Sequence, residues 1–213
     1  MPNDGPVEKV TDGLKQAYGL EGPDAVGKFY AGWADGYEDE VTTNGYITPE
    51  RCSNALASFV EDKTAPIMDL ACGTGLSGLA LRAVGFTTID GFDLSPEMLE
   101  KAKLKTGIYR ALEVCDMSQP FEMPGDVYAH AAAIGCITPD YLPVTVLDEI
   151  LGKLPTGGFF TFSINDWAAR DGSMERHIGE ITDCWAAELV FKEYGDHVPG
   201  NDMGCTVYVL KKR

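Results

Sequence analysis

Positive charge is scarce in this sequence. Its 213 residues include 17 Lys and Arg against 33 Asp and Glu, which gives a formal net charge of −16. The one basic cluster is Lys211-Lys212-Arg213. An acidic surface repels the phosphates of nucleic acids and anionic lipids. We therefore expect neither a nucleic acid nor a membrane as a partner.

Long hydrophobic runs, secretion signals and paired cysteines are also missing. No window holds the roughly 18 apolar residues of a membrane-spanning helix. The start, Met1-Pro-Asn-Asp-Gly-Pro, has neither a basic nor an apolar region typical of a signal peptide. The six cysteines contain no C-x-x-C pair, so neither a zinc site nor a disulfide framework is indicated. These features predict a cytoplasmic protein with reduced thiols and no metal.

The motifs of several hydrolase classes are absent as well. There is no H-E-x-x-H, no G-x-S-x-G, and only three histidines. Repeats and low-complexity linkers are not found either. With 45% hydrophobic residues and this length, the chain fits one globular domain.

A glycine-rich segment is the most informative feature that is present. The apolar run Ile67-Met-Asp-Leu leads into Ala71-Cys-Gly-Thr-Gly, and a helical pattern begins near Ser77. Glycines without Cβ atoms allow a sharp turn and close approach of a ligand. Asp93 ends a second apolar run 18 residues after Gly75, near the spacing typical of a ribose-binding acid. The order strand, loop, helix, strand, acid predicts a nucleoside site.

Two nucleoside ligands fit this pattern, a dinucleotide and S-adenosylmethionine. Dinucleotide loops space their glycines as G-x-G-x-x-G and place a pyrophosphate at the end of the strand. Asp69 would repel that phosphate, whereas it suits a ligand that carries an ammonium group. The sequence therefore favours S-adenosylmethionine.

The segment Asp69-Leu-Ala-Cys-Gly-Thr-Gly resembles motif I of the class I S-adenosylmethionine-dependent methyltransferases. The segment Gly91-Phe-Asp-Leu-Ser-Pro-Glu-Met-Leu-Glu-Lys-Ala resembles the one that follows it in that family. A narrower resemblance is to the methyltransferase-like proteins of the Williams–Beuren syndrome region and their bacterial relatives. It rests on Tyr30-x-x-Trp33-Ala-x-x-Tyr37, Gly45-Tyr46-x-x-Pro49, Ile134-Gly135 and Tyr208-Val-Leu-Lys-Lys.

The resemblance implies a set of cofactor-binding residues. Asp69 would meet the donor's amino group, unless it only caps the following helix, and Asp93 would accept both ribose hydroxyls. Asp116 would accept from the adenine amine, or alternatively only form a turn. The other expected cofactor residues are Tyr30, Tyr37, Ala71, Gly73, Thr74, Gly75, Leu94, Met98, Met117, Ala133 and Ile134. Ala71 stands where the fuller family pattern has glycine.

Aromatic residues at helical spacing precede the glycine loop. Tyr30, Trp33 and Tyr37 share one face of a helix. They predict either a lid whose rings face the sulfonium or an ordinary core stripe, with Trp33 evenly balanced between the two. Tyr46 would add to the same wall.

Residues on the acceptor side are less clearly marked. Asp166 follows the fifth expected strand, and His177 lies in the next helix; either could remove a proton from an acceptor. The alternative is a solvated loop acid and a surface histidine. His130, inside an apolar strand, is expected to be a neutral core residue.

Alternating patterns predict an α/β fold of the Rossmann-like, class I methyltransferase type. Strands are expected near 66–71, 88–93, 109–114, 129–134, 158–164, 187–193 and 204–211, and helices near 7–18, 23–34, 49–62 (capped by Thr48), 76–84, 96–106, 143–154 and 174–184. The last two strands lack an intervening helix, so we expect a seven-stranded, mostly parallel sheet with an antiparallel C-terminal hairpin. Residues 1–62 would form a helical lid and 63–213 the methyltransferase domain.

The predicted function is in-line methyl transfer from S-adenosylmethionine to a small molecule, by a monomer or homodimer. One alternative is a regulatory or lyase-type protein that binds the cofactor on the same fold. A nicotinamide-dependent oxidoreductase is a further alternative.

Overall fold

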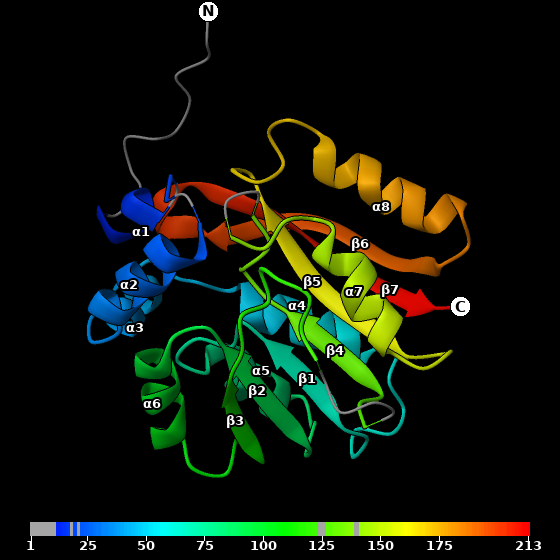
Figure 1. The fold of residues 1–213 in the computed structure, drawn as a ribbon, viewed down its shortest axis with the longest axis horizontal. Helices are drawn as coiled ribbons and strands as arrows, with labels where there is room; N and C mark the ends of the chain where they lie inside the picture. The colour runs from blue at the N-terminus through cyan, green and yellow to red at the C-terminus, as the bar shows by residue number, and fades with distance from the viewer. Residues whose placement is uncertain (1–11, 18, 21, 123–126, 139–140) are drawn as a thin grey trace, which may run out of the picture.

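The computed structural model of the chain describes residues 12–17, 19–20, 22–122, 127–138 and 141–213. Seven strands form one sheet in the order β3-β2-β1-β4-β5-β7-β6 (Figure 1). The strands are β1 (Ile67–Leu70), β2 (Ile89–Asp93), β3 (Ala111–Val114), β4 (His130–Ala133), β5 (Phe159–Asn165), β6 (Ala187–Val198) and β7 (Met203–Lys212).

The sheet confirms the predicted mixed topology. Strands β1 to β5 pair in parallel, whereas β7 pairs antiparallel with both β5 and β6. Two antiparallel steps restore the direction, so β6 runs the same way as β5. The carboxyl ends of β1, β2, β4, β5 and β6 therefore lie at one edge of the sheet, where open α/β folds bind ligands.

Helices cover both faces of the sheet, which explains why the central strands β1, β2 and β4 are buried along their whole length. Side chains alternate along β4: Ala131 and Ala133 join one hydrophobic cluster, and Ala132 joins the other. The first cluster includes residues of α7 (Val146–Lys153) and α8 (Ser173–Asp183). The second includes residues of α4 (Thr48–Ala57) and α5 (Leu76–Ala83).

The N-terminal helices lie beside the carboxyl edge of the sheet (Figure 1). They are α1 (Asp12–Ala17), α2 (Pro23–Trp33) and α3 (Tyr37–Thr43), and α2 packs against α6 (Pro96–Leu104). The expected helix over 7–18 lies partly outside the described residues. The sequence did not predict α3, a short helix with three acidic residues in its first turn. The boundary at residue 62 stays a prediction, although α4 belongs to the layered core.

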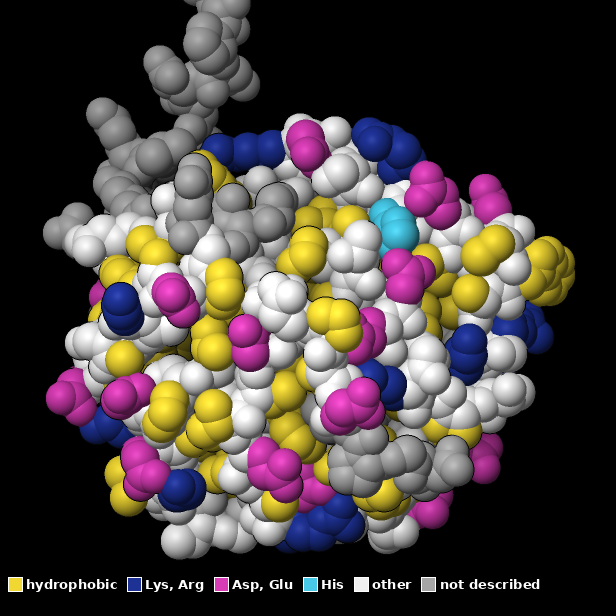
Figure 2. All heavy atoms as spheres, viewed as in Figure 1, with side chains coloured by type: hydrophobic (Ala, Val, Ile, Leu, Met, Phe, Trp, Pro, Cys, Tyr) yellow, Lys and Arg dark blue, Asp and Glu magenta, His cyan; other side chains and the backbone are white. Residues whose placement is uncertain are grey.

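Two surface properties bear on the expected partners. None of the helices in the described part of the chain is long and apolar enough to cross a bilayer. Figure 2 shows acidic side chains spread over one face, with the basic ones separated from each other. No continuous basic area is seen among the coloured residues of that face, in keeping with the charge balance of the sequence.

Three local predictions need correction. Thr48 is the first residue of α4 and not its cap; Ile47 holds the cap position, and the Thr48 hydroxyl turns to His197. The same helix ends at Ala57 because the chain turns there. The C-terminal hairpin is also longer than expected. Strand β6 continues past the expected end at residue 193 to Val198, and a 3-10 turn at Pro199–Asn201 leads into β7.

His130 lies buried at the start of β4, as the sequence predicted. Its Nδ1 atom accepts a hydrogen bond from the Phe159 backbone N–H at 3.1 Å. Burial lowers the pKa of His130 to about 4, so the ring is neutral at pH 7.

Candidate functional site

A cavity lies between the carboxyl edge of the sheet and the N-terminal helices. Its empty volume, counting the open mouth, is about 1050 Å³. Eight of the predicted cofactor residues line it: Tyr30, Tyr37, Ala71, Gly73, Asp93, Leu94, Met98 and Ile134. The structure thus gathers residues from α2, α3 and α6, from the end of β2 and from the loops after β1 and β4 around one space.

The loop after β1 has an unusual backbone. Gly73 has φ +55°, and a Cβ placed there would meet nothing within 4 Å. Ala71 adopts φ +50°, a left-handed conformation that costs a non-glycine residue roughly 1–2 kcal/mol. This explains why the fuller motif has glycine at the position of Ala71. The open space above Gly73 allows a ligand to lie against the backbone.

Asp93 connects the ends of β1 and β2. Its Oδ2 atom accepts from the Gly73 N–H at 2.8 Å, and its Oδ1 atom accepts from the Ser95 N–H at 2.9 Å. A carboxylate has about four acceptor sites, so each oxygen can still take a ligand hydroxyl. Burial raises the pKa of Asp93, which makes further donors to its carboxylate favourable.

Asp69 lies beneath the loop and does not line the cavity. Its Oδ2 atom accepts from the Ser77 hydroxyl and the Tyr109 hydroxyl, both at 2.7 Å. Its Oδ1 atom is buried without a hydrogen-bond partner among the described residues. Burial raises the pKa of Asp69 to about 7. The residue therefore ties the loop to α5, with one oxygen left for an ammonium group or a bridging water.

The aromatic face of the N-terminal helices divides between the cavity and local packing. Tyr30 and Tyr37 line the cavity, with their rings 6.3 Å apart. Burial, and then the charge of Asp93, raise the pKa of Tyr30 to about 12, so its hydroxyl stays neutral. Trp33 packs edge-on against Tyr37 and donates from Nε1 to Glu40 at 3.0 Å. Trp33 supports the two tyrosines and does not line the cavity.

Two lysines of α6 and its C-cap connect the N-terminal helices to the rest of the site. Lys101 pairs with Asp35. Lys105 pairs with Glu38 at 2.5 Å and also donates to the Thr74 carbonyl at 2.8 Å. Lys105 thus joins α3 directly to the glycine loop.

Other predicted cofactor residues do not line the cavity. Gly75 caps α5 with a left-handed backbone, and Thr74 is buried beside it. Asp116 accepts from the backbone and hydroxyl of Ser118, which is the turn interpretation left open by the sequence. Met117 and Ala133 are buried in the hydrophobic core.

Neither predicted acceptor-side base reaches the cavity. Asp166 accepts from the Gly204 N–H at 2.8 Å and fastens the end of β5 to β7. His177 lies on α8, where its ring contacts Asp148 and Glu180. Both side chains bond to neighbouring protein groups away from the cavity, in keeping with the alternative of a loop acid and a surface histidine.

The cavity also contains residues that the sequence did not mark. His197 lines it from the end of β6, and Cys136 lines it after β4. Tyr46, suggested only as part of a wall, packs edge-on against His197 at a centroid distance of 5.2 Å. Gly135 has φ +72°, and a Cβ there would lie 2.2 Å from the Tyr46 hydroxyl, so only glycine fits. A histidine in an apparent loop gave no signal in the sequence.

Comparison with known proteins identifies similarity to methyltransferases. Residues 67–158 match a family model described as a methyltransferase domain. Human methyltransferase-like protein 27 is 32% identical over 158 residues, which are 72% of this chain and 63% of the human protein. The chain therefore spans less than two thirds of the length of this relative.

Solved structures share the fold at low sequence identity. A TehB-like SAM-dependent methyltransferase from Corynebacterium glutamicum has a TM-score of 0.63 and 19% identity, over 87% of this chain and 99% of that one. Magnesium protoporphyrin IX methyltransferase from Synechocystis, solved with bound SAM, has a TM-score of 0.61 and 13% identity, over 81% and 84% of the two chains.

Proposed function

We propose that the chain is a class I, S-adenosylmethionine-dependent methyltransferase, in keeping with the methyltransferase domain matched over residues 67–158, and that it transfers the methyl group of this cofactor to a small-molecule acceptor. The observation that carries the proposal is the cavity itself. It opens over the glycine loop, has a buried carboxylate at one side, and is closed by tyrosines of the N-terminal helices.

The residues present fit the cofactor. Asp93 has free acceptor capacity for two ribose hydroxyls, and the space above Gly73 admits a ligand against the backbone. The unpartnered Oδ1 atom of Asp69 lies beneath the loop and would reach the ammonium group through a bridging water. Leu94 and Met98 supply apolar cover beside Asp93 for a base.

When bound, S-adenosylmethionine supplies a methyl group already activated by a sulfonium. The chain's own residues then need mainly to hold the two reactants in line and to exclude water. Tyr30 and Tyr37 would shield the sulfonium and attract it through cation–π contacts, worth ~0.5–2 kcal/mol. Closure of α2 and α3 over the site completes this enclosure.

The form of the cavity favours a small acceptor. Its described lining faces inward under the N-terminal helices, and it offers no Lys or Arg for a nucleic acid backbone. The net charge of −16 opposes polyanions as well. We therefore expect a metabolite and not a nucleic acid as acceptor, with the protein acting in the cytoplasm as a monomer or homodimer.

Two measurements test the proposal. Calorimetric titration should show binding of S-adenosylhomocysteine and no binding of NADH. Incubation with S-adenosylmethionine and separate pools of amines, thiols, phenols and carboxylates should then release S-adenosylhomocysteine with one of them. Gly73→Val, which forces a branched side chain into a left-handed backbone, is the binding-deficient control.

The outcomes separate the alternatives. Binding of NADH without any response to S-adenosylhomocysteine would favour an oxidoreductase. Cofactor binding with no turnover across all pools would favour a regulatory or lyase-type protein and would contradict methyl transfer.

A further inference from the structure

His197 occupies a β-bulge at the carboxyl edge of the sheet. In the β6–β7 ladder, Asp196 pairs with Gly204 and Val198 pairs with Met203, so His197 is the extra residue between them. A bulge bends the strand and redirects a side chain, and bulges are common beside active sites. Here the bulge directs the buried imidazole into the cavity lining.

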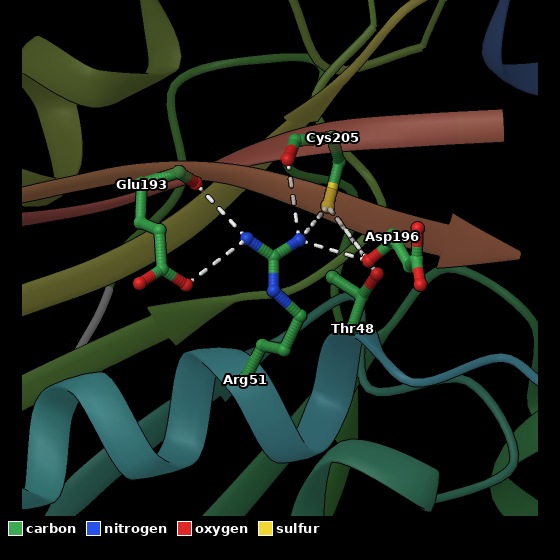
Figure 3. Close-up of polar contacts among 5 residues, drawn as sticks. All are labelled: Thr48, Arg51, Glu193, Asp196 and Cys205. Carbon is green, nitrogen blue, oxygen red and sulfur yellow. Dashed lines mark hydrogen bonds and ion pairs between the residues drawn. The ribbon is translucent and has the colours of Figure 1, made fainter.

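Arg51 of α4 holds this irregular segment in place (Figure 3). Its guanidinium donates to the carbonyl oxygens of Glu193, Asp196 and Cys205 at 3.0, 2.8 and 3.2 Å. It also reaches the Cys205 sulfur at 3.2 Å. A bulge interrupts the hydrogen-bond ladder, and Arg51 supplies donors to carbonyls around the interruption. Arg51 therefore holds the backbone around His197 in a defined conformation.

Thr48 fixes the orientation of the ring. Its hydroxyl lies 2.7 Å from Nδ1 of His197 and 3.4 Å from the sulfur of Cys205. The ring carbon between the two nitrogens, Cε1, lies 4.0 Å from a Cβ placed on Gly135, which follows β4. In the neutral tautomer that carries its proton on Nδ1, this nitrogen donates to the Thr48 hydroxyl, and Nε2 is left to accept a hydrogen bond from a ligand.

No cation lines the described part of the cavity beside the ring, and the guanidinium of Arg51 is turned away to the carbonyl oxygens of Glu193, Asp196 and Cys205. Burial, and then the charge of Arg51, lower the pKa of His197 to about 4, so the imidazole is neutral at pH 7. Burial also raises the pKa values of Tyr46 and Cys136 well above their usual range, which keeps both neutral. The described cavity lining has no Lys or Arg. A carboxylate or phosphate would be desolvated here without compensation.

We propose that His197 is the residue that binds the methyl acceptor, through Nε2, and that the acceptor is a neutral molecule with an O–H or N–H group. This inference rests on the proposed function, because it assigns the acceptor side of the same cavity. Thr48 acts as a positioning residue, since it reaches the acceptor only through the ring of His197.

Nuclear magnetic resonance of histidine nitrogens gives a direct test. The chain has only three histidines, so the variants His177→Gln and His197→Gln assign all their signals. The full-length protein is first saturated with S-adenosylhomocysteine, and its binding is confirmed by calorimetry. Phenol is then the neutral donor probe, toluene the apolar match, and benzoate the anionic one.

Phenol should shift the Nε2 signal of His197 and leave those of His130 and His177 in place. Toluene should leave all three unshifted, and benzoate should bind more weakly than phenol. His197→Gln should weaken phenol about threefold to tenfold, the range of one neutral hydrogen bond. His177→Gln, outside the cavity, should not alter phenol affinity.

Thr48→Val removes the hydroxyl at nearly constant shape and should shift the Nδ1 signal and weaken phenol, whereas Thr48→Ser should restore both. If His197→Gln does not fold, the wild-type signals still decide. No change at His197 up to the solubility limit of phenol, or equal shifts with toluene, would overturn the assignment. Since S-adenosylhomocysteine binding is measured first, a failure there would count against the proposed function instead.

Discussion

Replacing Asp93 by alanine should separate cofactor binding from folding more clearly than any other change. The carboxylate is buried and already accepts from two backbone amides, of Gly73 and Ser95. Both ribose hydroxyls of the cofactor would be its remaining donors. Hydrogen bonds to a charged group contribute ~1.5–3 kcal/mol each before water compensates the loss.

We expect the dissociation constant of S-adenosylhomocysteine to rise by about 10- to 150-fold, equivalent to ~1.4–3 kcal/mol. Thermal stability of the unliganded variant should fall less, because removal of a buried carboxylate also removes its desolvation cost. Titration calorimetry and a thermal scan with and without ligand measure the two effects. The ligand-dependent rise in Tm should shrink in Asp93→Ala.

Asp171→Ala provides a matched control. Asp171 also accepts two local hydrogen bonds, from the backbone and hydroxyl of Ser173, but it lies on the exposed loop before α8. Its replacement should leave ligand affinity unchanged. An unchanged dissociation constant in Asp93→Ala, with the fold intact, would refute the ribose assignment.

Three further predictions concern backbone strain, the N-terminal helices and pH. Ala71→Gly should relieve the left-handed backbone and raise the free energy of unfolding by up to ~1 kcal/mol in urea titrations, after the entropy of glycine offsets part of the gain. A loss of stability would contradict the strain. Lys105→Met should weaken S-adenosylhomocysteine binding and speed amide hydrogen exchange in α2 and α3; Lys103→Met, whose partner Glu100 is exposed on the same helix, should do neither. The folded state binds fewer protons at His197 than the unfolded state between about pH 4 and 6.5, so stability from this residue is full above pH 6.5 and is lost as pH falls toward 4, by ~1–3 kcal/mol. The raised pKa of Asp69 changes stability in the opposite direction over this pH range. Its effect cancels when the free energy of unfolding of His197→Gln, from urea titrations, is subtracted from that of the wild type at each pH. A difference that does not change with pH would disprove the His197 contribution.

The fold and the donor side could be predicted because their signals are local. The apolar run before Asp69, the glycine loop and Asp93 fall within 27 consecutive residues, and the strand order brings their ends together. Gly73 and Asp93 then meet through a single hydrogen bond. Sequence spacing alone carries that information, since β1 and β2 are neighbours joined by one helix.

The expectations for Asp166 and His177 rested on position alone. Asp166 does follow β5 at the correct edge, yet its carboxylate turns to the backbone of Gly204. His177 follows β5 in the sequence by only 12 residues, but its ring contacts Asp148 of α7 and Glu180 of α8 at the surface. Direction of a side chain depends on the partners that other segments offer, and a sequence pattern does not contain those partners.

The acceptor side differs because it depends on distant contacts and on a broken pattern. Polar residues of β6 such as Lys192, Glu193 and Asp196 face solvent on an edge strand, so the segment has no strict apolar alternation. The bulge then shifts the register by one residue and places His197 inward, where alternation alone would not predict its direction. Its hydroxyl partner is 149 positions away in the chain. A site made this way can change its acceptor through the hairpin and the start of α4 while the glycine loop keeps the donor, so exchanges at His197 and Thr48 should alter acceptor preference and leave cofactor affinity nearly constant.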